Sequence, residues 1–266
     1  MNKAPLSSPV GDTIASEASS GAAGGAIAQY LGKHGFEALH PKAVLFDMDG
    51  VLYDSMPNHA VAWQKSMERF GIKMLPQDAY ATEGARGVDT IRQMVRKQQG
   101  RDIDEAEAQR MYDEKTRIFH QMPEPNIMPG VLELMAQIHA DGLLVGVVTG
   151  SGQRPLINRL LKDFGRFLDE SQITTAYDVK QGKPNPDPYL KGLQKAGNLE
   201  PWEAVVVENA PLGVRAGVAA RIFTIAVNTG PLHADALLQE GANLIFSQMP
   251  ELSRQWQHLF SYDKPR

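Results

Sequence analysis

Two carboxylates stand two residues apart, at Asp47 and Asp49, in a segment that follows a short apolar run and ends in Gly50. At this spacing both side chains can face one site from a single turn. One carboxylate can attack phosphorus and form an aspartyl-phosphate, while a second can protonate the leaving oxygen and then activate water. Carboxylate oxygens also bind Mg²⁺. The pair therefore indicates phosphoryl transfer at a magnesium site.

Three further segments carry the other groups that phosphoryl transfer needs, at Thr149, Lys183 and Glu208. A phosphate ester repels an anionic nucleophile, so its charge must be neutralised, and the ammonium of Lys183 would balance what a metal leaves. Thr149 and the flexible amides of Gly150 and Ser151 would hold the phosphoryl oxygens. The four segments together supply carboxylates, a hydroxyl, amides and an ammonium.

Each of these signals has a simpler explanation when taken alone. An Asp-x-Asp-Gly segment also occurs in calcium-like loops and turns, a strand-end turn accounts for Thr149-Gly150, and a lone lysine such as Lys183 is usually a solvated surface residue. Glu208 is a stronger signal because a carboxylate that ends a buried strand needs a partner. His59 fits a structural role and a substrate-facing role equally well.

The elements that must position these groups are strands of a parallel sheet. Short continuous apolar runs, typical of strands buried on both faces, alternate with helical patterns. The runs lie at 43–46, 143–148, 204–207, 223–227 and, more weakly, 243–246. In a doubly wound sheet, ligands bind beyond the carboxyl ends of the strands, so the polar segments should meet at one edge. The sequence predicts an α/β fold with a Rossmann-like doubly wound parallel sheet.

Residues 54–128 interrupt the alternation because they carry helical patterns and no strand pattern. Ala60, Trp63 and Met67 form an apolar stripe, and Asp104 begins a capping box. We therefore predict a core domain of residues 41–53 and 129–266 with an inserted helical cap domain of residues 54–128. Residues 1–40 include a small, polar stretch and are expected to form a disordered or loosely attached tail.

Composition excludes several classes of protein. The 266 residues carry 27 Lys and Arg against 31 Asp and Glu, a net charge of −4 with no basic run, which argues against a nucleic-acid partner. Cysteine is absent, so disulfides, zinc–thiolate sites and a cysteine nucleophile are excluded. No apolar stretch approaches a membrane span and the first residues lack a signal-peptide pattern. We expect a monomeric cytoplasmic protein with no membrane partner.

Four motifs in order resemble the haloacid dehalogenase superfamily, in the β-phosphoglucomutase-like clade. They read VLFDMDGVL at 44–52, VVTGS at 147–151, GKPNP at 182–186 and VENAPLG at 207–213. A cap-sized helical insertion separates the first two. The resemblance implies a Rossmann-like core covered by a mobile helical cap.

The resemblance also implies roles for the core residues. Asp47 would be the nucleophile and Asp49 the general acid/base. Mg²⁺ would be held by Asp47, by the backbone carbonyl of Asp49 and by Glu208. Thr149 and Lys183 would bind the transferring phosphoryl group.

Three positions depart from the family pattern, one in the fourth motif and two in the cap. Asn209 stands where the family often has a second acidic residue, and its oxygen could still bind the metal or a metal-bound water. In the cap, the mutases carry a lysine and an arginine that grip a sugar phosphate. Here Glu83 and Gly87 take those places, and Arg86 could partly substitute as a substrate-binding residue. With Glu83 reaching the metal, the pattern is more similar to an inorganic pyrophosphatase of this clade.

We therefore expect a Mg²⁺-dependent phosphohydrolase that acts through an aspartyl-phosphate on inorganic pyrophosphate or a small phosphate ester. A β-phosphoglucomutase or a sugar-phosphate phosphatase is the alternative. The small phosphorylated substrate, or pyrophosphate, is the expected partner in either case.

Overall fold

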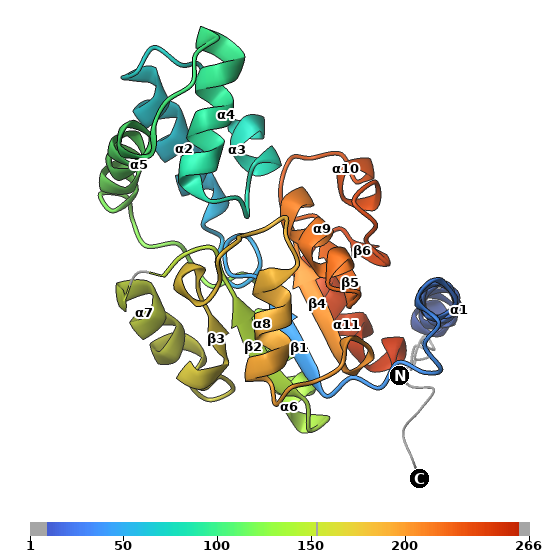
Figure 1. Cartoon of the computed structure of the whole chain (residues 1–266). Helices are drawn as coiled ribbons and strands as arrows, with labels where there is room; N and C mark the ends of the chain where they lie inside the picture. The colour runs from blue at the N-terminus through green and yellow to red at the C-terminus, as the bar shows by residue number, and fades with distance from the viewer. Residues whose placement is uncertain (1–9, 153, 261–266) are drawn as a thin grey trace, which may run out of the picture.

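Six parallel strands form one sheet in the order β3-β2-β1-β4-β5-β6 (Figure 1). The strands are β1 (Ala43–Phe46), β2 (Leu144–Val148), β3 (Ile173–Thr174), β4 (Ala204–Glu208), β5 (Phe223–Val227) and β6 (Leu244–Phe246). The structure is a computed structural model that describes residues 10–152 and 154–260. Phe46 pairs with Val147 on one side and with Val207 on the other. Residues that follow these three positions therefore reach the same edge of the sheet.

Helices cover both faces of the sheet, which explains why β1, β4 and β5 are buried along their whole length and are apolar except for Thr224 and the terminal Glu208. On one face pack α6 (Val131–Ala140), α7 (Arg154–Phe164) and α11 (Met249–Leu259). On the other pack α8 (Asp187–Lys195) and α9 (Pro211–Ala219), with the short α10 (Asp235–Leu238) beside α9. The predicted doubly wound α/β fold is confirmed. None of the described helices is long and apolar enough to cross a membrane.

Between β1 and α6 the chain forms four helices with a hydrophobic cluster of their own. They are α2 (Met56–Glu68), α3 (Pro76–Ala81), α4 (Gly87–Gln99) and α5 (Glu105–Phe119), and they lie together beyond the sheet in Figure 1. Trp63, Ile91 and Met111 belong to this cluster, which contains no residue of the sheet. The backbone N–H of Glu107 donates to Asp104 at 2.7 Å, which starts α5 where the capping box predicts. We call residues 54–128 the cap.

Two linkers, residues 50–55 and 120–130, join the cap to the core. They run side by side, because Asp54 N–H donates to the Asn126 carbonyl at 2.9 Å and Met128 N–H donates to the Leu52 carbonyl at 2.8 Å. Arg159 of α7 contacts both linkers. Its guanidinium lies 4.3 Å from the centre of the Tyr53 ring and donates to the Pro125 carbonyl.

The amino-terminal region differs from the sequence expectation. We expected residues 1–40 to be a disordered or loosely attached tail, but α1 (Val10–His34) packs against the core beside α11 (Figure 1). Tyr30 is 1% exposed, and its hydroxyl donates to the Arg221 carbonyl at 2.8 Å. Residues 1–9 lie outside the described residues. Alanine, serine and glycine obscured this helix in the sequence, and one aromatic anchor was not enough to reveal it.

Replacing Tyr30 tests whether α1 is a structural part of the core. Tyr30→Ala should lower the free energy of unfolding by about 3–5 kcal/mol, as for other large buried aromatic side chains. Tyr30→Phe should cost about 1 kcal/mol, because only the hydrogen bond is lost. Urea unfolding measures both, with Leu238→Ala on exposed α10 as the control. A loosely attached helix would make Tyr30→Ala as mild as the control.

Candidate active site

A buried ammonium lies between two carboxylates at the carboxyl edge of the sheet. Asp47 directly follows β1, Glu208 ends β4, and Lys183 comes from the loop before α8. Lys183 Nζ lies 2.5 Å from Asp47 Oδ1 and 2.7 Å from Glu208 Oε1. It also donates to the Val148 carbonyl at 3.1 Å. The strand register and this one cation therefore bring three predicted site residues together.

The opposite charges in this cluster stabilise one another. Burial alone would lower the pKa of Lys183, but Asp47 and Glu208 together raise it, so the ammonium stays charged. Burial raises the pKa of Asp47 to about 7, with Lys183 opposing and the neighbouring carboxylates Glu208 and Asp49 adding to the rise. A further cation beside Asp47 would favour the ionised form that a nucleophile needs.

Glu208 is fixed on both of its oxygens. The Tyr189 hydroxyl donates to Oε1 at 2.8 Å, and the backbone N–H groups of Asn209 and Ala210 donate to Oε2 at 2.9 and 3.2 Å. A Cβ at Gly213 would lie 1.8 Å from Oε1, so only glycine leaves room for this carboxylate. The fourth motif, residues 207–213, thus fixes the position of the Glu208 carboxylate.

One orphaned oxygen in this region fits a magnesium site. Asn209 Oδ1 is buried and has no hydrogen-bond partner among the described residues, a situation that is uncommon without an ion or a water. Among the described residues, no group of three or more His, Asp or Glu side chains is placed to bind a metal ion without other ligands. Mg²⁺ keeps several waters, so the Asp47 carboxylate, the Asp49 carbonyl and Asn209 Oδ1 suffice as protein oxygens. Glu208 would have to share an oxygen that already accepts hydrogen bonds.

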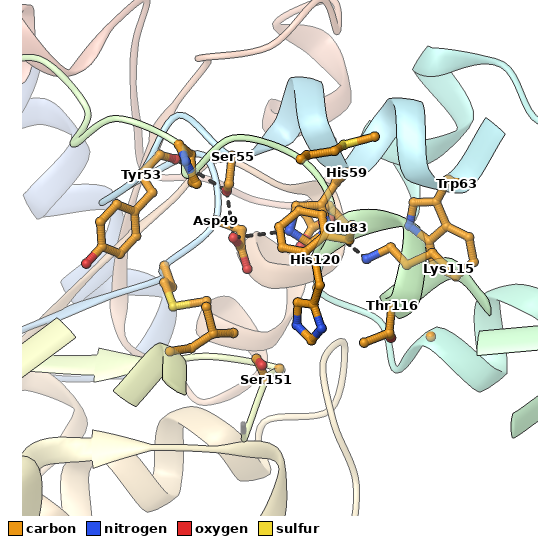
Figure 2. A pocket seen from close by; sticks show the side chains of 18 of the residues that line it. Asp49, Tyr53, Ser55, His59, Trp63, Glu83, Lys115, Thr116, His120 and Ser151 are labelled. Carbon is orange, nitrogen blue, oxygen red and sulfur yellow. Dashed lines mark hydrogen bonds and ion pairs between the residues drawn. The ribbon is translucent and has the colours of Figure 1, made fainter. Parts of the chain in front are cut away.

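Asp49 faces the cap and takes part in a chain of three side chains (Figure 2). His59 Nε2 lies 3.3 Å from Asp49 Oδ1, and Lys115 Nζ lies 2.9 Å from His59 Nδ1. A protonated lysine can only donate, so Nδ1 accepts and the ring proton is on Nε2, facing the carboxylate. The Ser55 hydroxyl donates to the same Asp49 oxygen at 2.6 Å.

This chain sets the protonation of Asp49. Burial alone would raise its pKa, but His59 and Ser55 bring the pKa of Asp49 down to about 2. Burial lowers the pKa of Lys115 to about 8, opposed by Glu83 and Asp49. Lys115 was not among the site residues predicted from the sequence. The signal was its position on the buried stripe of α5, where apolar residues otherwise stand.

The loop before α4 packs closely against the core. Gly84 has a φ of +85°, and a Cβ there would lie 3.3 Å from Lys183 Cδ and 3.5 Å from the Gly213 nitrogen. Arg86, expected to bind substrate, does not line the cavity between cap and core but a smaller one beside it, which Thr149 and Lys183 also line. Its guanidinium donates to both Asp89 oxygens at 2.7 and 3.0 Å and is half exposed. The Asp89 carboxylate, which lies one helical turn later in α4, binds the Arg86 guanidinium.

Cap and core enclose a cavity of about 270 Å³. The predicted site residues that line it are Asp47, Asp49, His59, Glu83, Gly150 and Ser151. Thr149 lies behind them, buried, and its hydroxyl oxygen accepts from the Ser151 N–H at 3.1 Å. Lys183 joins Asp47 to Glu208, and Asn209 lies beside Gly50. The structure therefore gathers the predicted site residues around this cavity, with Arg86 in a smaller neighbouring one that Thr149, Gly150 and Lys183 also line.

Comparison with known proteins places these features in a family. A model of the haloacid dehalogenase-like hydrolases matches residues 44–227. Hexitol phosphatase A of Escherichia coli strain K12 is 35% identical over 192 residues, which are 70% of this chain and 83% of that protein. A phosphorylated carbohydrates phosphatase of Thermotoga maritima is 30% identical over 207 residues, 76% of this chain and 92% of that protein.

A solved structure from Bacteroides vulgatus, named only provisionally as a β-phosphoglucomutase, is also similar. It has a TM-score of 0.87 and 50% identity, covering 91% of this chain and 98% of that one.

The protonation of Glu83 gives a pH-dependent stability that can be measured. Burial raises the pKa of Glu83 from 4.5 to about 8, with Asp49 and Asp47 adding to the rise. The folded protein then keeps a proton that the unfolded chain releases, so this contribution to stability is complete below about pH 4.5 and lost as pH rises toward 8. Glu83→Gln should flatten the corresponding fall in Tm of the metal-free protein. Exposed Glu133→Gln is the control, and an unchanged pH dependence in Glu83→Gln would refute the assignment.

Proposed function

Because the chain belongs to the haloacid dehalogenase-like hydrolases, we propose that it is a Mg²⁺-dependent phosphatase that hydrolyses small phosphorylated carbohydrates through an aspartyl-phosphate. The observation that carries the proposal is the pair of carboxylates two residues apart with different partners. Asp47 is held against Lys183 at 2.5 Å, while Asp49 faces His59 at 3.3 Å in the cavity below the cap. One is arranged as a nucleophile and the other as an acid/base.

The two carboxylates divide the reaction between them. Asp47 attacks phosphorus, and the backbone amides after Thr149 donate hydrogen bonds to the phosphoryl oxygens. Asp49 is ionised in the structure, the form that removes a proton from water when the aspartyl-phosphate is hydrolysed. Protonation of the leaving oxygen needs the acid form of Asp49, which the arriving phosphate favours by its negative charge. Asp47, the Asp49 carbonyl and Asn209 would hold Mg²⁺, which would neutralise charge on the phosphoryl oxygens when bound.

The substrate class rests on the cavity and on the relatives. A volume of about 270 Å³ is near the lower end of small-molecule pockets, about 300–1,000 Å³, and leaves room for an organic leaving group beside the phosphoryl site. Two relatives are named for hexitol and carbohydrate phosphates. Both observations support a carbohydrate phosphate.

The expectation of pyrophosphate finds no support in the relatives, two of which are named for hexitol and carbohydrate phosphates. Burial raises the pKa of Glu83 in the metal-free protein, with Asp49 and Asp47 adding to the rise, and a bound Mg²⁺ would oppose that rise. The choice of substrate therefore rests on the relatives and on the cavity. We therefore favour the sugar-phosphate alternative.

A mutase remains the second candidate because of the provisional name of the 50% identical structure. The assay that separates the two reactions follows β-glucose 1-phosphate with Mg²⁺. A phosphatase releases inorganic phosphate and glucose, whereas a mutase forms glucose 6-phosphate without net release.

Substitution of each carboxylate tests the proposed division of roles. Asp47→Asn should abolish phosphate release from hexitol and hexose phosphates, because an amide cannot form the acyl phosphate. Asp49→Asn should lower kcat by about 10²–10⁴, as expected for a lost general acid/base. Asp235→Asn, on exposed α10, is the matched control. Appreciable turnover by Asp47→Asn, or wild-type activity that EDTA leaves unchanged, would refute the mechanism.

The contact between His59 and Asp49 should be visible in the pH profile. Without His59, burial is less opposed and the pKa of Asp49 rises above about 2. In His59→Ala an acid limb should therefore appear in kcat/KM at a pH where the wild type shows none, with kcat lowered. Asn58→Ala, on the same helix, controls for local disruption. A lower but unshifted profile would mean that His59 is only structural.

A further inference from the structure

The cap wall of the cavity is aromatic. Trp63, Tyr112 and Phe119 line it, and the centres of the Trp63 and Tyr112 rings are 6.2 Å apart. Lys115 Nζ lies 5.0 to 5.8 Å from the three ring centres. In Figure 2 Trp63 and Lys115 lie on the cap side, opposite Ser151 of the core. The leaving group must therefore lie against rings as well as polar groups.

Tyr112 takes its position because residue 87 has no side chain. A Cβ at Gly87 would lie 2.0 Å from Tyr112 Cε2 and 2.2 Å from Cδ2, far inside contact distance. Gly87 begins α4 and Tyr112 lies in α5, so the ring covers the start of the neighbouring helix. Any larger residue at position 87 must displace the ring. The two residues form one unit, which we call the Tyr112–Gly87 contact.

Charge in the cavity opposes a second anionic group. Of the described residues that line it, two are lysine or arginine, and both have partners. Lys115 binds His59 at 2.9 Å, and Arg159 binds Asp163 at 3.3 Å. The carboxyl groups along the same cavity belong to Asp47, Asp49, Glu83 and Glu124. A second phosphate or a carboxylate on the leaving group would meet the ionised Asp49, further carboxyl groups and an aromatic wall, while Lys115 and Arg159 are each already bound to a neighbouring side chain.

The same wall suits an uncharged, hydroxylated leaving group. Aromatic rings bury apolar area, and a tyrosine hydroxyl adds a polar end. Thr116, Ser151 and exposed His120 and Glu124 line the cavity as hydrogen-bonding groups. A sugar or polyol offers both carbon–hydrogen faces for the rings and hydroxyls for these groups.

We infer that Tyr112, seated on Gly87, is a specificity-determining residue that limits the leaving group to an uncharged polyol or sugar. This inference rests on the proposed phosphatase activity. It adds that carbohydrate monophosphates are hydrolysed while bisphosphates and phosphorylated acids are rejected at the leaving-group side.

The test compares kcat/KM for glucitol 6-phosphate and fructose 1,6-bisphosphate in four proteins. The wild type should prefer the monophosphate by about 100-fold or more, since like charges facing one another are strongly disfavoured. Tyr112→Phe keeps the ring and should keep the preference. Tyr112→Ala should reduce it about tenfold, through a higher KM for the monophosphate. Adding Gly87→Arg to Tyr112→Ala places a cation in the vacated space and should raise the bisphosphate value further.

The outcomes separate failure of the inference from failure of the proposed function. If the wild type releases phosphate from neither substrate, nor from other small phosphate esters with Mg²⁺, the proposed function fails. If it hydrolyses both substrates equally well, or if Tyr112→Ala lowers both values by the same factor, the phosphatase stands and the inference is overturned.

A stability measurement tests the contact without substrate. Gly87→Ala should lower the Tm of the wild type, because its Cβ overlaps the ring, and should have little effect in the Tyr112→Ala background, where the space is open. An equal loss in both backgrounds would contradict the Tyr112–Gly87 contact.

Discussion

The charge of Lys183 between Asp47 and Glu208 is the constraint on which the rest of the site depends. A charge removed from water is stable only if its partners are close and fixed, because desolvation costs several kcal/mol per ion. The fold meets this demand with parts that are distant in sequence. The register of β1 and β4 aligns the two acids, and the loop before α8 delivers the ammonium. Because the cluster is satisfied by core residues alone, its preorganisation does not depend on the cap.

The second half of the chemistry belongs to the cap. Asp49 stands in the core segment, but its acidity is governed by His59 of α2 and Lys115 of α5. The carboxylate that we propose as the acid/base is thus tuned by the cap, which two linkers join to the core. Arg159 contacts both linkers, so the hinge is itself braced from α7. The proposed nucleophile Asp47 and acid/base Asp49 lie two residues apart, yet Asp47 contacts Lys183 of the core and Asp49 contacts His59 of the cap.

Sequence reasoning succeeded where a local pattern has one structural solution. Continuous apolar runs fixed the longer strands, and polar residues directly after them had to meet at one edge, so Asp47 and Glu208 could be anticipated. Strand β3 has two residues, too few for a pattern. The orientation of Arg86 could not be predicted, because it depends on a partner three residues later, Asp89. The substrate expectation drawn from Glu83 finds no support in the relatives, because one acidic residue in a cap loop does not encode the shape and lining of the cavity that receives the leaving group.

The position of α1 bears on how this protein can be handled. Tyr30 binds the carbonyl of Arg221, just before β5, so α1 is anchored at the amino ends of the strands, across the sheet from the cavity. Helix α11 packs beside it. A fusion partner or an immobilising surface attached through either helix would therefore sit on the far side from the cap. The protein could be tethered at that end without covering the cap or the cavity.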